Sequence, residues 1–280
     1  MPAPKTSIDD IMWLLIVASA LSFWLASFIA CVSRKSPSVY NGGPFEGKNV
    51  LLVVAHPDDE SMFFSPTILY LTTRGYNLRL LCLSTGNADG KGDMRKHELL
   101  KACALLGVPT EQVKVLDHPN LQDGFGNNWD HSLLAKIVKE EIASCGINVV
   151  ITFDSYGVSG HCNHRDVHYG VRKLTLESSH GDIKAWELVS TNILRKYIGP
   201  IDIWTSILYA SSNPARSIQL LTNEDPRKSY AAMSLHASQW VWFRKLFIAF
   251  SSYSYMNTLR RIHPTDSSHE GPLPETNKEL

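Results

Sequence analysis

The amino-acid sequence predicts an α/β protein: a Rossmann-like, doubly wound and mainly parallel sheet, preceded by one N-terminal transmembrane helix. Three observations predict it. Short apolar, β-branched runs alternate with helix-like segments along most of the 280 residues. An uncharged apolar run stands near the N-terminus. Hydrophobic residues make up 44% of the chain, which is enough to build the core of one sizeable domain.

The first element is the apolar run at residues 11–32. It holds no charged side chain and matches the ~20 residues that cross a bilayer core. A signal peptide has a shorter apolar core and a basic start, whereas Asp9 and Asp10 precede this run. Arg34 and Lys35 follow it directly, so the positive-inside rule predicts that the C-terminal side faces the cytosol.

The remaining elements alternate. Residues 1–10 form a flank and residues 33–47, with proline and glycine but no periodicity, a linker. Strands are predicted at residues 49–55, 78–84, 113–117 and 147–153, with later strands at 187–191 and 216–222. Between them, helices are predicted at residues 65–74, 93–106, 130–144 and from His164 onward.

This order of elements also predicts where a site would lie. In doubly wound sheets, ligands bind outside the carboxyl ends of the strands, where the strand order reverses. In the common order that point lies between the first and fourth strands. We therefore expect function in the loops that follow residues 55 and 153.

Composition excludes some classes of function. The 27 basic and 27 acidic residues balance, which gives no electrostatic footprint for nucleic acid. No GxGxxG follows the first strand, so a dinucleotide-binding role is disfavoured. The cysteines are odd in number and scattered, which argues against a disulfide framework and fits a reducing compartment: Cys31, Cys82, Cys103, Cys145 and Cys162.

The two predicted loops carry metal-binding side-chain types. The first reads AHPDDE and begins at residue 55; the second reads GHCNH and ends at His164. Histidine with a carboxylate is a common zinc ligand set, and a second carboxylate can serve as general base. Spacing alone leaves open which of His161, His164 and His168 would bind a metal, because all three can share a helix face.

The motifs AHPDDE, STGNADGKG, RKHEL and GVSGHCNH, in this order, resemble the GlcNAc-phosphatidylinositol de-N-acetylases. These belong to the wider superfamily of zinc-dependent sugar de-N-acetylases, which includes the bacterial mycothiol-pathway deacetylase. The resemblance runs from about residue 48 to about residue 262. The apolar run that precedes it favours the eukaryotic membrane branch over the soluble bacterial one.

The resemblance implies a role for each residue of the two loops. His56, Asp59 and His164 would bind zinc, although nitrogen and oxygen ligands also suit iron or manganese. Asp58 would be the general base that takes a proton from the attacking water. His161 would be the second acid, which stabilises the oxyanion and helps the amine leave.

Four further positions bear on this expectation. By resemblance, Arg95 and Glu98 line the substrate region, where Arg95 could pair with a phosphate. Bacterial relatives carry an aspartate just before the last ligand, where it can hold the catalytic histidine charged, but here Asn163 stands there. An amide cannot raise a histidine pKa as a carboxylate does, so Asp166 is the candidate substitute.

The C-terminal stretch 235–262 mixes aromatic and basic residues. Its apolar part is too short to span a bilayer, and we expect an aromatic and basic helix that lies in the membrane interface or packs on the sheet. It closes the predicted catalytic domain, residues 48–262. Residues 263–280 are polar and proline-containing, and are expected to be a disordered tail.

Together these features predict hydrolysis of the N-acetyl amide of GlcNAc-phosphatidylinositol to glucosaminyl-phosphatidylinositol and acetate, the second step of GPI-anchor biosynthesis. The apolar run and its basic flank predict a single-pass membrane protein whose catalytic domain faces the cytosol. No residue signal encodes an organelle, and the endoplasmic reticulum is expected from the resemblance. Two alternatives remain: a de-N-acetylase of a soluble amino-sugar conjugate, and a non-catalytic membrane subunit with a leftover metal site. No residue pattern identifies a protein partner.

Overall fold

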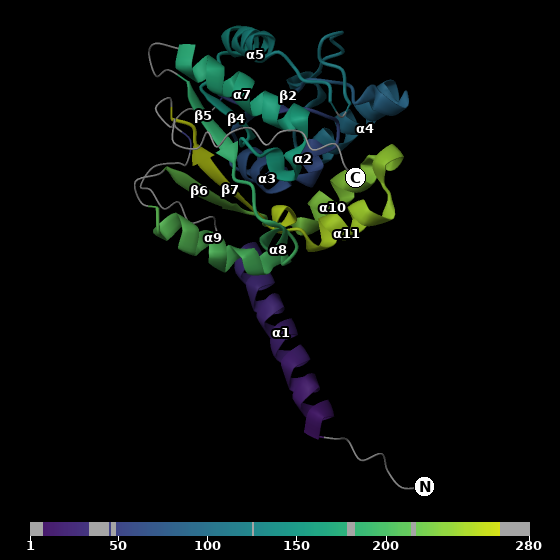
Figure 1. The fold of residues 1–280 in the computed structure, drawn as a ribbon, viewed down its shortest axis with the longest axis vertical. Coiled ribbons are helices and arrows are strands. Elements are labelled where there is room, and N and C mark those ends of the chain that lie inside the picture. Colours follow the sequence, from purple (N-terminus) through teal and green to yellow (C-terminus); the bar gives the residue numbers. More distant parts are fainter. Residues whose placement is uncertain are drawn as a thin grey trace.

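The computed structural model describes residues 8–33, 45, 49–124, 126–177, 183–213 and 217–263. Most of the predicted N-terminal flank and linker lies outside the described residues, and so does nearly all of the predicted tail. The described parts form one sheet with helices around it and one long helix, α1 (Ile8–Ser33), that projects away from the globular part (Figure 1).

The sheet has seven strands in the order β3-β2-β1-β4-β5-β7-β6. Its first five strands in that order pair in parallel, and β7 is antiparallel to both β5 and β6. The strands are β1 (Asn49–Val54), β2 (Asn77–Cys82), β3 (Val113–Val115), β4 (Val149–Phe153), β5 (Lys184–Leu188), β6 (Ile218–Thr222) and β7 (Met256–Arg261). The predicted fold class is confirmed, with the order reversing between β1 and β4.

The prediction was wrong for the last strand. Residues 256–261 were expected to belong to the aromatic and basic helical stretch 235–262, but they form β7. This strand buries polar side chains instead of showing an apolar run. The Asn257 side chain accepts from the Thr67 amide at 3.1 Å and donates to the Phe63 carbonyl at 2.8 Å, which ties β7 to the segment behind the first loop.

Helices cover both faces of the sheet. The right-handed crossovers from β1 to β2 and from β4 to β5 run in opposite directions across the sheet, and therefore place their helices on opposite faces. The globular part has the helices α2 (Asp59–Met62), α3 (Ser65–Thr73), α4 (Gly92–Leu105), α5 (His131–Cys145), α6 (Gly157–Gly160), α7 (Cys162–Glu177), α8 (Ile193–Lys196), α9 (Asp202–Ser211), α10 (Pro226–Leu235) and α11 (Trp242–Phe250).

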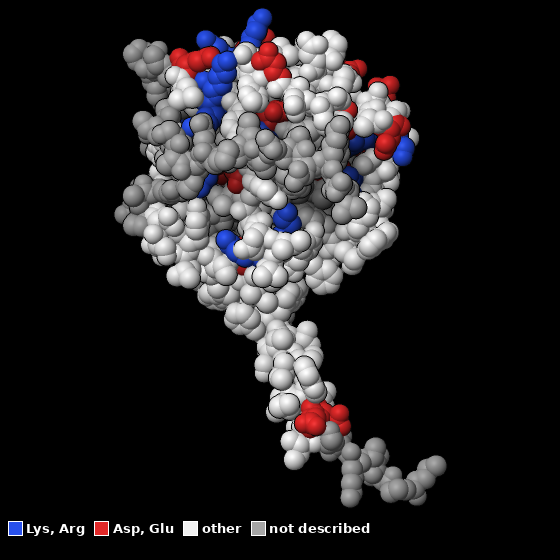
Figure 2. All heavy atoms as spheres, in the orientation of Figure 1, with Lys and Arg blue, Asp and Glu red and all other residues white. Residues whose placement is uncertain are grey.

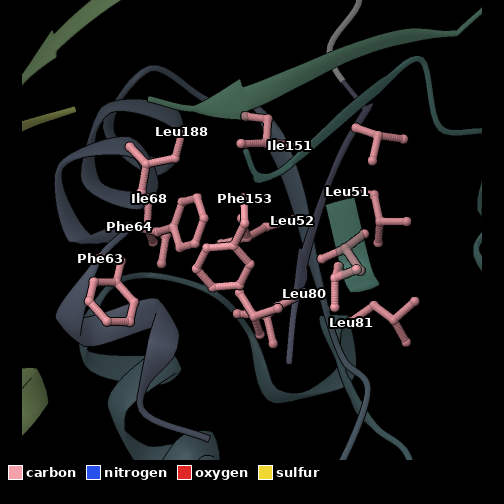
Figure 3. Packing of buried hydrophobic residues seen from close by; sticks show 14 of the residues in the cluster. Leu51, Leu52, Phe63, Phe64, Ile68, Leu80, Leu81, Ile151, Phe153 and Leu188 are labelled. Atoms are coloured by element: carbon pink, nitrogen blue, oxygen red, sulfur yellow. The ribbon is translucent and has the colours of Figure 1, made fainter. Parts of the chain in front are cut away.

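The core sits on both sides of β1 and β4. Consecutive side chains of β1, such as Leu51 and Leu52, are both fully buried, as expected for a central strand covered by helices on each face (Figure 3). The rings of Phe64 and Phe153 meet edge to face, with centroids 5.1 Å apart. This contact packs the end of β4 against the segment between α2 and α3, so the two site loops rest on a rigid base.

The C-terminal end of α1 is packed against the globular part. Trp24 and Phe28 stack with centroids 5.7 Å apart, and both meet the edge of Tyr255. Within the described residues, α1 is the one helix long and apolar enough to cross a membrane, with a mean hydropathy of 2.3. Most of its surface is exposed, so the globular part does not cover it.

Candidate active site

The two predicted loops meet at the carboxyl edge of the sheet. One cavity of about 440 Å³ is lined by all five residues of the predicted catalytic and metal set: His56, Asp58, Asp59, His161 and His164. Arg95 also lines it, whereas Glu98 is not among the lining residues. The volume suits a sugar-sized group. The fold therefore brings together residues that lie about a hundred positions apart in the chain.

The turn between β1 and α2 presents two adjacent carboxylates in different directions. Asp58 has a φ of 116°, in the left-handed region that is uncommon for a residue with a side chain. Asp59 turns back under the strand end, where its Oδ2 accepts from the amides of Ala55 at 3.1 Å and His56 at 2.8 Å. Its Oδ1 lies 3.2 Å from Nε2 of His164. The turn thus separates the roles of the two aspartates.

The second loop is held by an unusually close backbone approach. The His164 ring bonds through Nδ1 to the Gly157 carbonyl at 2.9 Å and stacks on Phe153 with centroids 4.2 Å apart. Gly157 has a φ of +67°, and a Cβ there would lie 2.6 Å from the His164 Cβ. Val158 follows with a φ of 64°, a strained conformation for a β-branched residue. These features fix Nε2 of His164 toward the cavity.

The donor set fits a divalent metal. Ring nitrogens of His56, His161 and His164 all lie within 4.8 Å of one another. Burial opposes ionisation of Asp59, but His164 and His56 lower the pKa of its carboxyl below the ordinary range. A charged carboxylate next to convergent imidazoles is a set that zinc accepts. The backbone bond at His164 Nδ1 is the kind of outer contact that orients a ligating histidine.

The cluster of ring nitrogens also includes His161, to which the resemblance gives the role of acid and not that of metal ligand. Its ring lies 4.9 Å from that of His56 and 5.0 Å from that of His164, centroid to centroid. Burial, together with the neighbouring His56 and His164, lowers the pKa of His161 to about 4. The three rings therefore form one cluster, in which any pair with Asp59 could complete a metal site.

Asp58 lies between two arginines. Its Oδ2 accepts from Arg244 at 2.6 Å, and Arg95 lies 3.4 Å from the same oxygen. Burial raises the pKa of Asp58 above its usual range, while the charges of Arg244 and Arg95 oppose that rise. A buried carboxylate whose pKa is raised by burial and lowered by neighbouring arginines suits a group that takes up and releases a proton.

The structure places the two residues considered as partners of His161 elsewhere. The Asp166 carboxylate accepts from the Trp129 amide at 2.9 Å and bonds to the His131 ring at 3.0 Å, away from the cavity. The Asn163 side chain lies against the His56 ring, with Oδ1 3.2 Å from Nε2. The backbone N–H of Asn163 donates to Nδ1 of His161. Neither residue therefore places a charged carboxylate next to His161.

Asp123 is the carboxylate that reaches the cluster instead. Its Oδ1 lies 3.1 Å from Nε2 of His56, and its Oδ2 lies 3.7 Å from Arg95. Burial lowers the pKa of His56, but Asp123 and Asp59 together raise it above the ordinary value. In the sequence, the one signal for Asp123 is its place after strand β3, at the same edge of the sheet. A loop without a function shows the same pattern.

The two predicted substrate-binding residues have different surroundings. Arg95 lines the cavity, with its guanidinium donating to the carbonyls of Gly86 at 2.8 Å and Pro57 at 2.7 Å. Glu98 accepts instead from the amide and the hydroxyl of Ser238 at 2.8 and 2.6 Å. Glu98 thus holds the segment before α11, and its contact with substrate stays a prediction.

Sequence reasoning did not identify the wall of the cavity opposite the histidines. Lys196 and Tyr197 at the end of α8, and Phe243, Arg244 and Phe247 of α11, line it. In the sequence, Arg244 is one of several basic residues in the aromatic and basic stretch 235–262. No local pattern marks it as a site residue, because its partner Asp58 is 186 positions away in the chain.

Known proteins match this chain over most of its length. The family model described as GlcNAc-PI de-N-acetylase matches residues 51–175. N-acetylglucosaminyl-phosphatidylinositol de-N-acetylase of Bos taurus is 38% identical over 248 residues, covering 88% of this chain and 96% of that protein. A probable N-acetylglucosaminyl-phosphatidylinositol de-N-acetylase of Dictyostelium discoideum is 36% identical and covers 77% of this chain and 93% of that protein.

Solved structures agree on the fold. N,N'-diacetylchitobiose deacetylase from Pyrococcus horikoshii matches with a TM-score of 0.56 over 84% of this chain and 91% of that chain, at 15% identity. At that identity the likeness concerns the fold alone. The sequence relatives carry the assignment, since they match across both site loops and most of the globular part. The chain therefore belongs to the GlcNAc-PI de-N-acetylase family.

Proposed function

We propose that the protein hydrolyses the N-acetyl amide of GlcNAc-phosphatidylinositol and releases acetate and glucosaminyl-phosphatidylinositol, the second step of GPI-anchor biosynthesis. One observation carries this proposal: a single cavity gathers three imidazoles and two differently held aspartates in a chain that matches 96% of the length of the bovine de-N-acetylase. The residue types are those that an amide hydrolase needs.

His56, Asp59 and His164 are the residues that we assign to hold a zinc ion. Such an ion would supply Lewis-acid activation of the amide carbonyl and of water. His164 Nε2 and Asp59 Oδ1 already lie 3.2 Å apart and face the cavity. The choice of zinc over iron or manganese rests on the family resemblance, because these ligand types suit all three metals.

Asp58 is the base in this scheme and His161 the acid. Both arginine contacts of Asp58 engage Oδ2, so we assign Oδ1 to accept the proton of the attacking water. His161 borders the same cavity, and we assign it to stabilise the developing oxyanion and to pass a proton to the leaving amine. Because the pKa of its ring is about 4 without substrate, the ring would take up that proton only as negative charge develops on the oxyanion. Arg95 lies 3.4 Å from Oδ2 of Asp58 and lines the cavity in which the substrate would bind.

The cellular placement belongs to the same proposal. Helix α1 is long and apolar enough to anchor the protein in a bilayer, and we place the catalytic domain at residues 48–262 on the cytosolic face of the endoplasmic reticulum. The basic pair Arg34 and Lys35 supports this orientation. The substrate would then be a phospholipid of the membrane that holds the enzyme.

The test is acetate release by the purified full-length protein from synthetic GlcNAc-phosphatidylinositol in detergent micelles. We expect activity that a chelator abolishes and added zinc restores. A water-soluble GlcNAc-inositol is assayed in parallel. Hydrolysis of the soluble compound alone would replace the lipid assignment with a soluble amino-sugar conjugate. Folded, zinc-loaded protein that releases no acetate from either compound would overturn the enzymatic proposal.

A further inference from the structure

Helices α8, α9 and α11 lie at the end of the globular part from which α1 emerges (Figure 1). Each carries exposed apolar side chains. Ile193 and Leu194 of α8 are 73% and 77% exposed. Leu208 of α9 is 66% exposed. On α11, Trp242 is 72% exposed, Phe243 54% and Leu246 50%. We call these six residues the apolar rim. A monomer in water seldom leaves so many large apolar groups together without a partner.

Helix α11 shows the feature most clearly, because it is apolar on two sides. Phe247 and Ile248 are buried in the core. Trp242 and Leu246 lie one turn apart on the other side and are exposed. Lys245 keeps its ammonium 5.6 Å from the Trp240 ring, next to the apolar side. Aromatic residues with an adjacent lysine are typical of helices that lie in a membrane interface.

The rim reaches the cavity at Phe243, which lines it. Tyr197, which follows α8, and Phe243 of α11 both line the cavity. Arg244, which bonds to Asp58, lies on the turn of α11 between rim residues Trp242 and Leu246. A molecule that reaches the histidine cluster between these two helices therefore passes the apolar rim.

The register of α1 places this end of the molecule at a membrane surface. Asp9 and Asp10 bound the apolar run, and a span of ~20 residues that starts after them ends near residue 30. Trp24, Ser27 and Phe28 fall inside that span, yet all three contact the globular part. The globular part must therefore meet the bilayer directly, with no intervening spacer.

Helix α9 marks the junction. Trp204 donates through its indole nitrogen to the Ser27 hydroxyl of α1 at 3.0 Å. Leu208 lies one turn farther along α9 and is exposed.

In the face shown in Figure 2, charged side chains gather at the end of the globular part away from α1, while the end next to α1 is mostly uncharged with a few basic groups. The charge distribution fits a lipid surface.

We infer that the apolar rim docks on the bilayer that α1 spans, so that the cavity mouth opens at the lipid surface. A lipid-linked head group would enter from the plane of the membrane, while its acyl chains stay in the bilayer. The choice of a lipid-linked substrate rests on the proposed function. The docking itself rests on the rim, the register of α1 and the uncharged end of the molecule.

A first experiment measures docking on the bilayer independently of enzymatic activity. The full-length protein is reconstituted in vesicles of phosphatidylcholine or of its brominated analogue, which quenches tryptophans at membrane depth. The fluorescence that Trp242→Phe removes should be strongly quenched in brominated vesicles. The fluorescence that Leu176→Trp adds should not be quenched. Leu176 is 54% exposed on α7, which lies at the end of the globular part away from α1 (Figure 1). Equal quenching at both positions would overturn the docking. So would the absence of quenching at Trp242, which is the result expected if a protein covers the rim instead of the bilayer.

A second experiment links docking to substrate entry. Leu194→Glu/Leu246→Glu should reduce acetate release from vesicle-embedded GlcNAc-phosphatidylinositol at least tenfold, through KM. It should leave hydrolysis of water-soluble GlcNAc-inositol and the thermal midpoint in detergent unchanged, and the control Leu176→Glu should change none of these. Unchanged activity of the double variant on the vesicle substrate contradicts the inference. A wild type inactive on both compounds contradicts the proposed function instead, and the quenching result still decides the docking.

Discussion

At the scale of single residues, Asp58 is the carboxylate whose surroundings most affect the chemistry. It is buried, sits in a left-handed turn and shares one oxygen between Arg244 and Arg95. Asp59, its neighbour, is instead bound by backbone amides and faces His164. Two adjacent aspartates thus have environments that suit a base and a metal ligand.

Asp58→Asn keeps the side-chain shape and removes the base. We expect acetate release to fall by about two to four orders of magnitude, the usual contribution of general base catalysis. Metal content, measured by elemental analysis of the purified protein, should stay near that of the wild type. His164→Ala is the matched control and should lose metal as well as turnover. Near-normal turnover of Asp58→Asn would remove Asp58 from the mechanism.

Gly157→Ala tests the close approach behind His164. The added Cβ would lie 2.6 Å from the His164 Cβ, at a backbone φ of +67°. We expect the imidazole to shift and metal affinity to fall by about 10- to 100-fold, as for other outer-shell changes. Gly75→Ala is the control, because Gly75 has a similar φ of +73° with nothing within 4 Å. Equal zinc affinity of the two variants, measured by chelator competition, would show that only backbone strain matters.

His236 predicts a pH dependence of stability. Its Nε2 lies 2.7 Å from Oε1 of Glu60, and both side chains are fully buried. Burial lowers the pKa of His236, but Glu60 raises it above 6.5 overall. The stabilisation is therefore complete below the unfolded-state pKa of about 6.5 and is lost as pH rises through the higher folded-state pKa.

The variant His236→Gln should lose that dependence. We expect its deficit in free energy of unfolding, relative to wild type, to be about 3 kcal/mol or more at pH 5.5 and to shrink above neutral pH. Denaturant unfolding of the detergent-solubilised protein measures it, with the exposed His97→Gln as control. A deficit that grows with pH would contradict the assigned ion pair.

At the scale of elements, β7 links the sheet to the site. It is antiparallel to its neighbours, and Asn257 on it holds the backbone at Phe63 and Thr67. This bond ties the last strand to the segment that supports the AHPDDE turn. The C-terminal strand thereby stabilises a loop from the opposite end of the domain.

Asn257→Ala should destabilise the domain by about 1–3 kcal/mol for each buried backbone group left without a partner. The control Asn77→Ala removes exposed side-chain bonds to Asn49 and Gln112 and should cost less than about 1 kcal/mol. Thermal melts of the two variants in detergent provide the comparison. Equal costs would mean that the buried amide adds nothing specific to β7.

At the scale of the whole molecule, the anchor, the rim and the cavity lie at one end. α1 meets the globular part next to α8, α9 and α11 (Figure 1). This arrangement limits how the globular part can tilt relative to α1, because Trp204 and Tyr255 both contact that helix. With α1 in a bilayer, as proposed, this junction would keep the cavity mouth close to the membrane without requiring a bound substrate.

The orientation of the anchor can be tested in the whole chain. The basic pair after α1 predicts a lumenal N-terminus and a cytosolic C-terminus. An N-glycosylation acceptor added at the N-terminus should be modified in microsomes, whereas the same acceptor at the C-terminus should not. A shift in gel mobility after glycosidase treatment shows whether each of the two acceptors carries a glycan. The reverse pattern would place the catalytic domain in the lumen and overturn the proposed localisation.

The sequence by itself determined the parallel order of strands, the two loops at the reversal point and the apolar span, because these depend on periodicity and on short motifs. The tertiary structure alone decided which charges meet: Arg244 with Asp58, Asp123 with His56, and Asp166 with Trp129 instead of His161. It also decided that residues 256–261 form a strand, since Asn257 is buried through bonds to a distant backbone. Such pairings depend on packing between segments far apart in the chain, and no local pattern encodes them.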